Sequence, residues 1–250
     1  MMMDDVLFGL LTAPPELAEI KRALFIQPHP DDNEIGAGGL MAKLIAMGAE
    51  VWALTVTDDR LVCPPEQWEN GLSLRQREVL DAQDVLGVKH AGFLGFADKT
   101  PASAEELALA IVPVIRKLRP DAVFSVDPEL PNECHRDHIK VGYAARFAVM
   151  DAVWAHFPPG ALHQDVWQTA ILGQYMTAAP NTIADITDVF EKKMAAISKH
   201  ASQVSTELFT VLELQAAYFG QRANVKYGEA VKLLRFLQLH CFNLPVEGII

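Results

Sequence analysis

The sequence has 250 residues, of which 50% are hydrophobic and 21% charged, a composition typical of a folded globular protein. Its net charge of −11 disfavours general binding to the phosphates of nucleic acids. The three cysteines lie far apart and form neither a disulfide framework nor a metal knuckle, so we expect a cytoplasmic protein. No apolar run reaches the roughly 18 residues of a membrane span, and residues 1–11 lack the basic start of a secretory signal.

The first part of the chain alternates predicted strands and helices. Apolar runs of strand length occupy residues 23–27, 50–57, 90–94 and 122–126. Segments with helical spacing or capping signals follow them at 35–47, 73–86, 103–118 and 139–155. This alternation predicts an α/β, Rossmann-like, doubly wound and mostly parallel sheet with helices on both faces.

The remaining segments are less regular. We expect a short helix at 14–21, strands at 167–176 and 182–186, a helix from Asp188 to Lys199 with Asp188 as its cap, and helices near 209–221 and 228–239. The chain contains no linker, so we expect a single domain, 1–250, in which 22–155 form the core and 156–250 complete it.

Two polar clusters follow the first and fourth predicted strands, at His29-Pro30-Asp31-Asp32 and His135-Arg136-Asp137-His138. The carboxyl ends of parallel strands share one edge of the sheet, so the clusters are expected to meet there. Taken alone, the first could be a solvated turn in which Asp32 caps the next helix, and the second a helix start with incidental histidines. Together, two imidazoles and a carboxylate match an open catalytic zinc site, although other divalent metals accept the same ligands.

The glycine-rich segment 36–39 leaves a second class of function open. A glycine-rich turn between a strand and a helix is typical of dinucleotide binding. Here Met41 stands where the third glycine belongs, and two carboxylates would face the pyrophosphate. Close approach of the helix to the strand ends explains these glycines better. A non-hydrolytic Rossmann-like nucleotide-binding module therefore remains the alternative from another class.

Together these motifs resemble the PIG-L/LmbE-type zinc-dependent de-N-acetylases. The similarity extends over about residues 22–205 and rests on the segments 28–32, 36–39, 75–78, 86–88, 135–138, 185–188 and 199–203. Segment 127–135 is most similar to the branch that contains archaeal diacetylchitobiose deacetylases. The resemblance implies a hydrolase that removes an acetyl group from an N-acetylglucosamine-type substrate and releases acetate and a free amine. The alternative within enzymes is a metal amidohydrolase acting on another N-acyl compound.

By position, the resemblance implies His29, Asp32 and His138 as ligands of one zinc ion per chain. It implies Asp31 as the general base that takes a proton from water. It implies His135 as the group that stabilises the oxyanion or donates a proton. The adjacency of two carboxylates then has a reason, because one holds the metal while the other stays available for water.

Four other residues are candidates for supporting roles. Arg75 offers a fixed fork of donors to sugar hydroxyls, with pairing to Glu78 as the alternative. Asp58 and His200 are further candidates for substrate contacts, with a solvated loop and a helix-end cap as the respective alternatives. Asp137 is a candidate for a hydrogen bond that orients a metal-binding imidazole.

The resemblance also sets expectations for partners. Members of the similar branch assemble as trimers or hexamers, so we expect a homo-oligomer, with contacts in the leucine-, phenylalanine- and tyrosine-rich residues 206–250. We expect a small acetamido sugar as substrate and neither a nucleic acid nor a membrane as partner. Arg136 stands where the family usually has proline and adds a cation next to His135.

Overall fold

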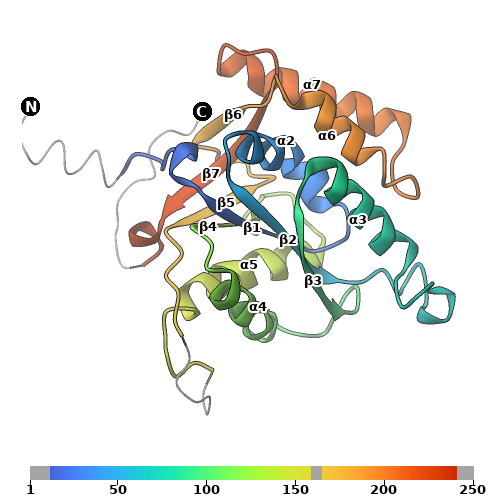
Figure 1. Ribbon diagram of the computed structural model, residues 1–250, viewed down its shortest axis with the longest axis vertical. Helices are drawn as coiled ribbons and strands as arrows, with labels where there is room; N and C mark the ends of the chain where they lie inside the picture. Colours follow the sequence, from blue (N-terminus) through green and yellow to red (C-terminus); the bar gives the residue numbers. More distant parts are fainter. Residues whose placement is uncertain (1–11, 159–164, 241–250) are drawn as a thin grey trace, which may run out of the picture.

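The computed structural model describes residues 12–158 and 165–240, so the predictions for residues 1–11 and for 241–250 lie outside the described residues. Within these ranges seven strands join one sheet in the order β3-β2-β1-β4-β5-β7-β6 (Figure 1). The strands are β1 (Arg22–Gln27), β2 (Glu50–Thr57), β3 (Lys89–Phe96), β4 (Ala122–Val126), β5 (Ile171–Tyr175), β6 (Thr182–Asp185) and β7 (Gly228–Arg235). β1 to β5 pair in parallel, and β7 lies antiparallel between β5 and β6. The predicted mostly parallel α/β sheet is confirmed.

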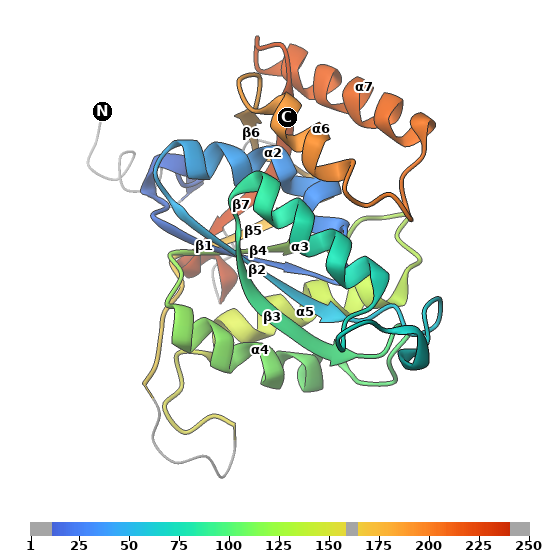
Figure 2. The same cartoon turned by 45° about the vertical axis from the view of Figure 1, so that its right-hand side comes forward.

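Helices cover both faces of this sheet, as Figures 1 and 2 show: α2, α3, α6 and α7 lie on one face, and α4 and α5 on the other. The helices are α2 (Asp32–Ala46), α3 (Leu74–Leu86), α4 (Ala104–Leu118), α5 (Arg136–Asp151), α6 (Phe190–Ile197) and α7 (Thr206–Arg222). The 3-10 turns are η1 (Leu17–Glu19), η2 (Pro65–Gln67) and η3 (Phe236–Leu239). Among the described residues, no helix combines the length and the apolar character that crossing a bilayer requires.

Strand β1 shows why the central strands are continuous apolar runs. Ala23 and Phe25 pack into the core under α2, whereas Leu24 and Ile26 pack into the core under α4 and α5. A strand with helices on both faces has no solvent side, so polar residues cannot alternate with apolar ones along it. This burial holds the end of β1, and the loop after it, in a defined position.

Capping signals set the helix boundaries that the sequence predicted most accurately. Ser73 and Ser103 each accept a hydrogen bond from the backbone N–H three residues later, whose side chain bonds back to the serine N–H. Gly87 ends α3 with a left-handed backbone (φ 81°), which glycine adopts readily. Helix α4 continues through Pro113 to Leu118.

The helix predicted at 228–239 is wrong. Residues 228–235 form strand β7, whose backbone pairs with β5 on one side and β6 on the other. Local spacing in the sequence GEAVKLLR suits a helix, but the open edge of β5 offers a full ladder of hydrogen bonds, and this tertiary context overrides the propensity. Residues 236–239 add only the short turn η3.

Two further boundary predictions are wrong. Asp188 does not cap α6, which begins after Val189; its carboxylate is 2.9 Å from Lys43 Nζ, so an ion pair with α2 replaces the cap. The helix predicted at 14–21 is only the single turn Leu17–Glu19. In the first case, Lys43 competes for the side chain that was expected to cap the helix. In the second, too few helical residues follow the start signal to form a stable helix.

Candidate active site

The two polar clusters lie at the carboxyl edge of the sheet, where the strand order reverses. The loop 28–31 leads from β1 into α2, and the loop 127–135 leads from β4 into α5. Because β1 and β4 are parallel neighbours, both loops start from the same edge. His135 is the N-cap of α5, and His138 lies in its first turn.

His29, Asp32 and His138 come together at this edge. Asp32 Oδ2 is 3.2 Å from His29 Nδ1, and Asp32 Oδ1 is 3.3 Å from His138 Nε2. The three side chains are 10%, 9% and 17% exposed. Ligand bonds of roughly 2.0–2.1 Å in tetrahedral geometry separate neighbouring ligand atoms by about 3.3 Å. The two separations, each to a different oxygen of Asp32, are compatible with ligation of a zinc ion or a similar divalent cation.

Two other groups of donors overlap this one. Within the part of the chain that the structure describes, ligand atoms of His29, His135 and His138 lie within 4.8 Å of one another, and so do those of His29, Asp98 and Asp137. Sequence reasoning missed Asp98, whose Oδ1 is 3.7 Å from His29 Nε2. Its position directly after β3, at the carboxyl edge, is the signal that could have found it.

Carboxylates lie behind the imidazoles. Buried Asp137 accepts a hydrogen bond of 2.6 Å from the backbone N–H of Lys99, and its Oδ2 is 3.4 Å from His29 Nε2. Glu133 Oε2 is 2.9 Å from His138 Nδ1. A carboxylate on the second ring nitrogen fixes the orientation of a metal-binding imidazole. Asp137 thus lies where such a role requires. Glu133 lies in the segment 127–135, but the sequence analysis did not single it out.

Asp31 forms an ion pair with Arg75 beside the cluster. Arg75 Nη2 is 2.8 Å from Asp31 Oδ2, and both side chains are 12% exposed. The alternative partner, Glu78, instead accepts hydrogen bonds from Ser202. Burial raises the pKa of Asp31, as does the charge of Asp32, while Arg75 opposes the shift. A carboxylate with a raised pKa is better suited to accept and return a proton.

The surroundings shift the pKa values of the imidazoles in different directions. Burial alone would lower the pKa of His29, but hydrogen bonds to Asp137 and Asp32 raise it to about 10. Burial lowers the pKa of His135, and the charges of His29 and His138 act in the same direction. His135 is therefore neutral more readily than its neighbours. The carboxylates that hold a proton on His29 would equally favour a cation that displaces that proton.

A cavity of 340 Å³ opens beside the cluster, within the size range of small-molecule sites. Its walls are His29, Asp31, Asp32, Leu61, Val62, Arg75, Asp98, Lys99 and His135. Leu61 and Val62, from the loop after β2, are 60% and 72% exposed and form an apolar part of the rim. The polar and apolar walls together suit a ligand with hydroxyl groups on one side.

Two predicted substrate contacts do not line this cavity. Asp58 is 1% exposed and accepts a hydrogen bond of 2.9 Å from Arg60 Nε. His200 is fully buried, with Nε2 3.5 Å from Glu34 Oε2, and it lies beyond the end of α6. Asp58 therefore pairs with Arg60, whereas His200 lies against Glu34 without a hydrogen bond to it. Neither residue lines the cavity.

The glycines of segment 36–39 have protein atoms against them. A Cβ on Gly36 would lie 2.5 Å from Tyr175 Cδ2, and one on Gly39 would lie 2.7 Å from Ile186 Cδ1. These are clashes with protein side chains. The close-approach interpretation of the glycines is therefore supported by the packing, and they offer no cradle for a pyrophosphate.

The sequence matches a known family and known relatives. Residues 24–149 match the family PIG-L, described as GlcNAc-PI de-N-acetylase. The chain is 34% identical over 230 residues to the diacetylchitobiose deacetylase of Thermococcus kodakarensis. The aligned region covers 89% of this chain and 86% of that protein. It is 27% identical over 198 residues to a probable N-acetyl-alpha-D-glucosaminyl L-malate deacetylase 2 of Bacillus cereus, covering 75% of this chain and 86% of the relative.

The fold matches as well. The solved N,N'-diacetylchitobiose deacetylase from Pyrococcus horikoshii, complexed with its inhibitor MPG, superposes with a TM-score of 0.80 at 30% identity, over 100% of this chain and 98% of that one. The family match spans about half of the chain, and the similarity to the Thermococcus protein spans most of it. The chain therefore belongs to the PIG-L family of de-N-acetylases, which are hydrolases acting on carbon–nitrogen bonds.

Proposed function

We propose that this protein is a zinc-dependent deacetylase of N-acetylglucosamine-type sugars, which releases acetate and a free amine. The observation that carries the proposal is the convergence of His29 and His138 on Asp32. His29, Asp32 and the neighbouring Asp31 line the cavity beside this cluster. The names of both relatives support the substrate class, because each acts on an acetamido sugar.

His29, Asp32 and His138 would hold the metal. When bound, zinc lowers the pKa of water toward about 7 and polarises a carbonyl oxygen. Asp31 pairs with Arg75 rather than with the imidazoles that flank Asp32, so its carboxylate is available to take a proton from water. Its raised pKa suits it to accept that proton and to return it to the amine nitrogen as the carbon–nitrogen bond breaks.

His135 has the complementary task. Its ring lies edge-on to that of His29, with centroids 4.6 Å apart, and it lines the cavity. From this wall a ring N–H can donate to the oxygen on which charge develops as water attacks the acetamide carbon. A donor held in place before the reaction needs no reorganisation as this charge forms.

The group attached to the sugar is less constrained than the sugar itself. The two relatives are named for a second sugar and for malate, respectively, at that position. The exposed rim residues Leu61 and Val62 are the part of the cavity wall best placed to meet that group. We further propose a homo-oligomer, a trimer or hexamer, in which the exposed Val211, Leu214 and Tyr218 of α7 are candidate contacts.

The test is acetate release from a panel of N-acetyl compounds. Zinc-loaded protein is incubated with N-acetylglucosamine, diacetylchitobiose, an N-acetylglucosaminyl malate and, for comparison, an N-acetylated amino acid. We expect equal amounts of acetate and free amine from at least one sugar. Release from the amino acid alone would favour the amidohydrolase alternative, and a purified chain that holds nucleotide but no metal would favour the nucleotide-binding module.

A further inference from the structure

Helix α2, which carries Asp32, is broken one turn after its start. Ala37 has φ −145° and ψ 15°, outside the helical range, so α2 consists of a short segment ending near Gly36 and a longer one beginning near Gly38. A break of this kind removes hydrogen-bond partners from backbone groups on both sides of it. Buried backbone groups must then find partners elsewhere.

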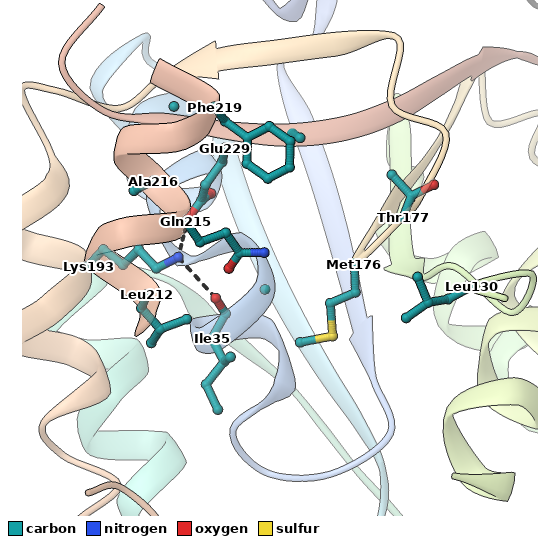
Figure 3. A pocket seen from close by; sticks show the side chains of 13 residues that line it. Ile35, Leu130, Met176, Thr177, Lys193, Leu212, Gln215, Ala216, Phe219 and Glu229 are labelled. Atoms are coloured by element: carbon teal, nitrogen blue, oxygen red, sulfur yellow. Dashed lines mark hydrogen bonds and ion pairs between the residues drawn. The ribbon is translucent and has the colours of Figure 1, made fainter. Parts of the chain in front are cut away.

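Two charged side chains from the C-terminal part of the chain supply these partners. The Glu229 carboxylate accepts hydrogen bonds from the N–H groups of Gly39 (3.0 Å) and Leu40 (2.6 Å). Lys193 Nζ donates to the carbonyl oxygen of Ile35 at 3.0 Å. Lys193 and Glu229 also pair with each other at 2.5 Å. Figure 3 shows Lys193 Nζ between the carbonyl oxygen of Ile35 and the carboxylate of Glu229. The three residues line a cavity of 270 Å³.

The charges have the signs that the two helix segments require. Glu229 is negative and lies at the N-terminus of the longer segment, and positive Lys193 lies at the carbonyl end of the shorter one. Both side chains are buried, with exposures of 3% for Lys193 and 7% for Glu229. Buried charges persist only when they are paired and hydrogen-bonded, as both are here.

The glycines make room for this pair. A Cβ on Gly38 would lie 3.2 Å from Lys193 Cγ, and a Cβ on Gly39 would lie 2.9 Å from Glu229 Oε1. The missing side chains therefore allow both charged residues to reach the α2 backbone. The glycine-rich segment and the ion pair form one structural unit.

We propose that Lys193 and Glu229 are positioning residues for the proposed metal site, acting through the break in α2. Their bonds fix the direction of the short segment, and this segment begins with Asp32, whose two oxygens face His29 and His138. The proposal rests on the proposed function for the identity of the metal, but it concerns the chain's own geometry. Neither residue contacts the proposed ligands or the cavity beside them.

The experiment compares Lys193→Met, Glu229→Gln and the double variant with a matched control, Arg116→Met. Arg116 is also a buried cation that donates to backbone carbonyls, but it belongs to α4 on the other face of the sheet. Circular dichroism confirms folding, and competition with a fluorescent chelator gives the zinc dissociation constant. We expect each single variant to weaken zinc binding by about 10- to 100-fold, the range seen for residues behind metal ligands. We also expect a lower kcat with little change in KM.

Each single variant leaves one buried charge without its partner and can fail to fold for that reason. The double variant removes both charges, so it can be tested even if a single variant does not fold. An unchanged zinc dissociation constant and kcat in the folded variants would overturn the proposal, as would an equal loss in Arg116→Met. A wild-type chain that binds zinc but releases no acetate would refute the proposed function alone, because the zinc measurement needs no substrate. A wild-type chain that binds no zinc would contradict both.

Discussion

The parallel part of the sheet and its C-terminal part contribute to the site in different ways. The segments after β1 and β4 bring a nitrogen of His29 and one of His138 to 3.2 and 3.3 Å, respectively, from the two carboxylate oxygens of Asp32. In contrast, α6 and β7 contribute Lys193 and Glu229, which contact the backbone of α2. Short motifs thus specify the chemistry, whereas their geometry depends on residues 158 to 190 positions further along the chain.

The largest effect in this comparison is expected from His29→Ala, in the loop after β1. Loss of a proposed ligand should weaken zinc binding beyond the roughly 100-fold limit expected for Lys193 or Glu229, and acetate release should vanish with it. Elemental analysis of purified protein measures the metal content. His90→Ala is the matched control, because His90 lies on β3, contacts Gln83 of α3 and is outside the cluster. Equal zinc content in both variants would remove His29 from the ligand set.

Asp31→Asn should separate chemistry from metal binding. The amide keeps the shape of the side chain but cannot take a proton, so kcat should fall by about 10²- to 10⁴-fold. Zinc content should stay at the wild-type level, because Asp31 pairs with Arg75 and not with the proposed ligands. A variant that keeps wild-type kcat would show that another group acts as the base.

These two parts of the molecule also differ in how far the sequence predicted them. The helix 73–86 was predicted to within a residue, because Ser73 and Gly87 are local signals that act on their own backbone. Strand β7 was mistaken for a helix, because its partners β5 and β6 lie elsewhere in the sequence. Local patterns predict an element well when the interactions that stabilise it are local.

The same distinction applies to the site. The histidines and carboxylates of the two motifs were identifiable from their spacing. Asp98 and Glu133 were not, because each is a single carboxylate whose importance appears only when the fold brings it to His29 or His138. Likewise, the pairing of Arg75 with Asp31 joins residues 44 positions apart, which no local pattern indicates.

A substitution in β5 would test the packing within the parallel part of the sheet. A Cβ on Gly173 would lie 2.1 Å from a ring atom of Phe124, whose ring stacks on Phe25. Gly173→Ala should therefore lower the free energy of unfolding by about 1–3 kcal/mol, as overpacking does. Urea denaturation measures it. Phe124→Leu should relieve the clash, so the double variant should lose less than the sum of the single losses; strict additivity would argue against this contact.

The smallest effect is expected at the opposite end of the strands from the site. Glu50 pairs with Arg22 and Lys89 near the surface, and hydrogen bonds from Lys89 and Arg22 lower its pKa from 4.5 to about 2. Such a group stabilises the fold above its unfolded pKa, and the contribution disappears as the pH falls from 4.5 toward 2. For an exposed pair we expect less than about 1 kcal/mol. Glu50→Gln and wild type should differ slightly in urea stability at pH 7 and converge in acid; a difference that grows in acid would contradict this.

The most direct test of the central proposal is an anomalous difference map, recorded at the zinc absorption edge, from crystals of the zinc-loaded protein. We expect one strong peak per chain at about 2.0–2.2 Å from a nitrogen of His29, an oxygen of Asp32 and Nε2 of His138. A peak at either competing donor group, His29 with Asp98 and Asp137 or His29 with His135 and His138, would contradict the proposed ligand set. So would the absence of any peak at this edge of the sheet.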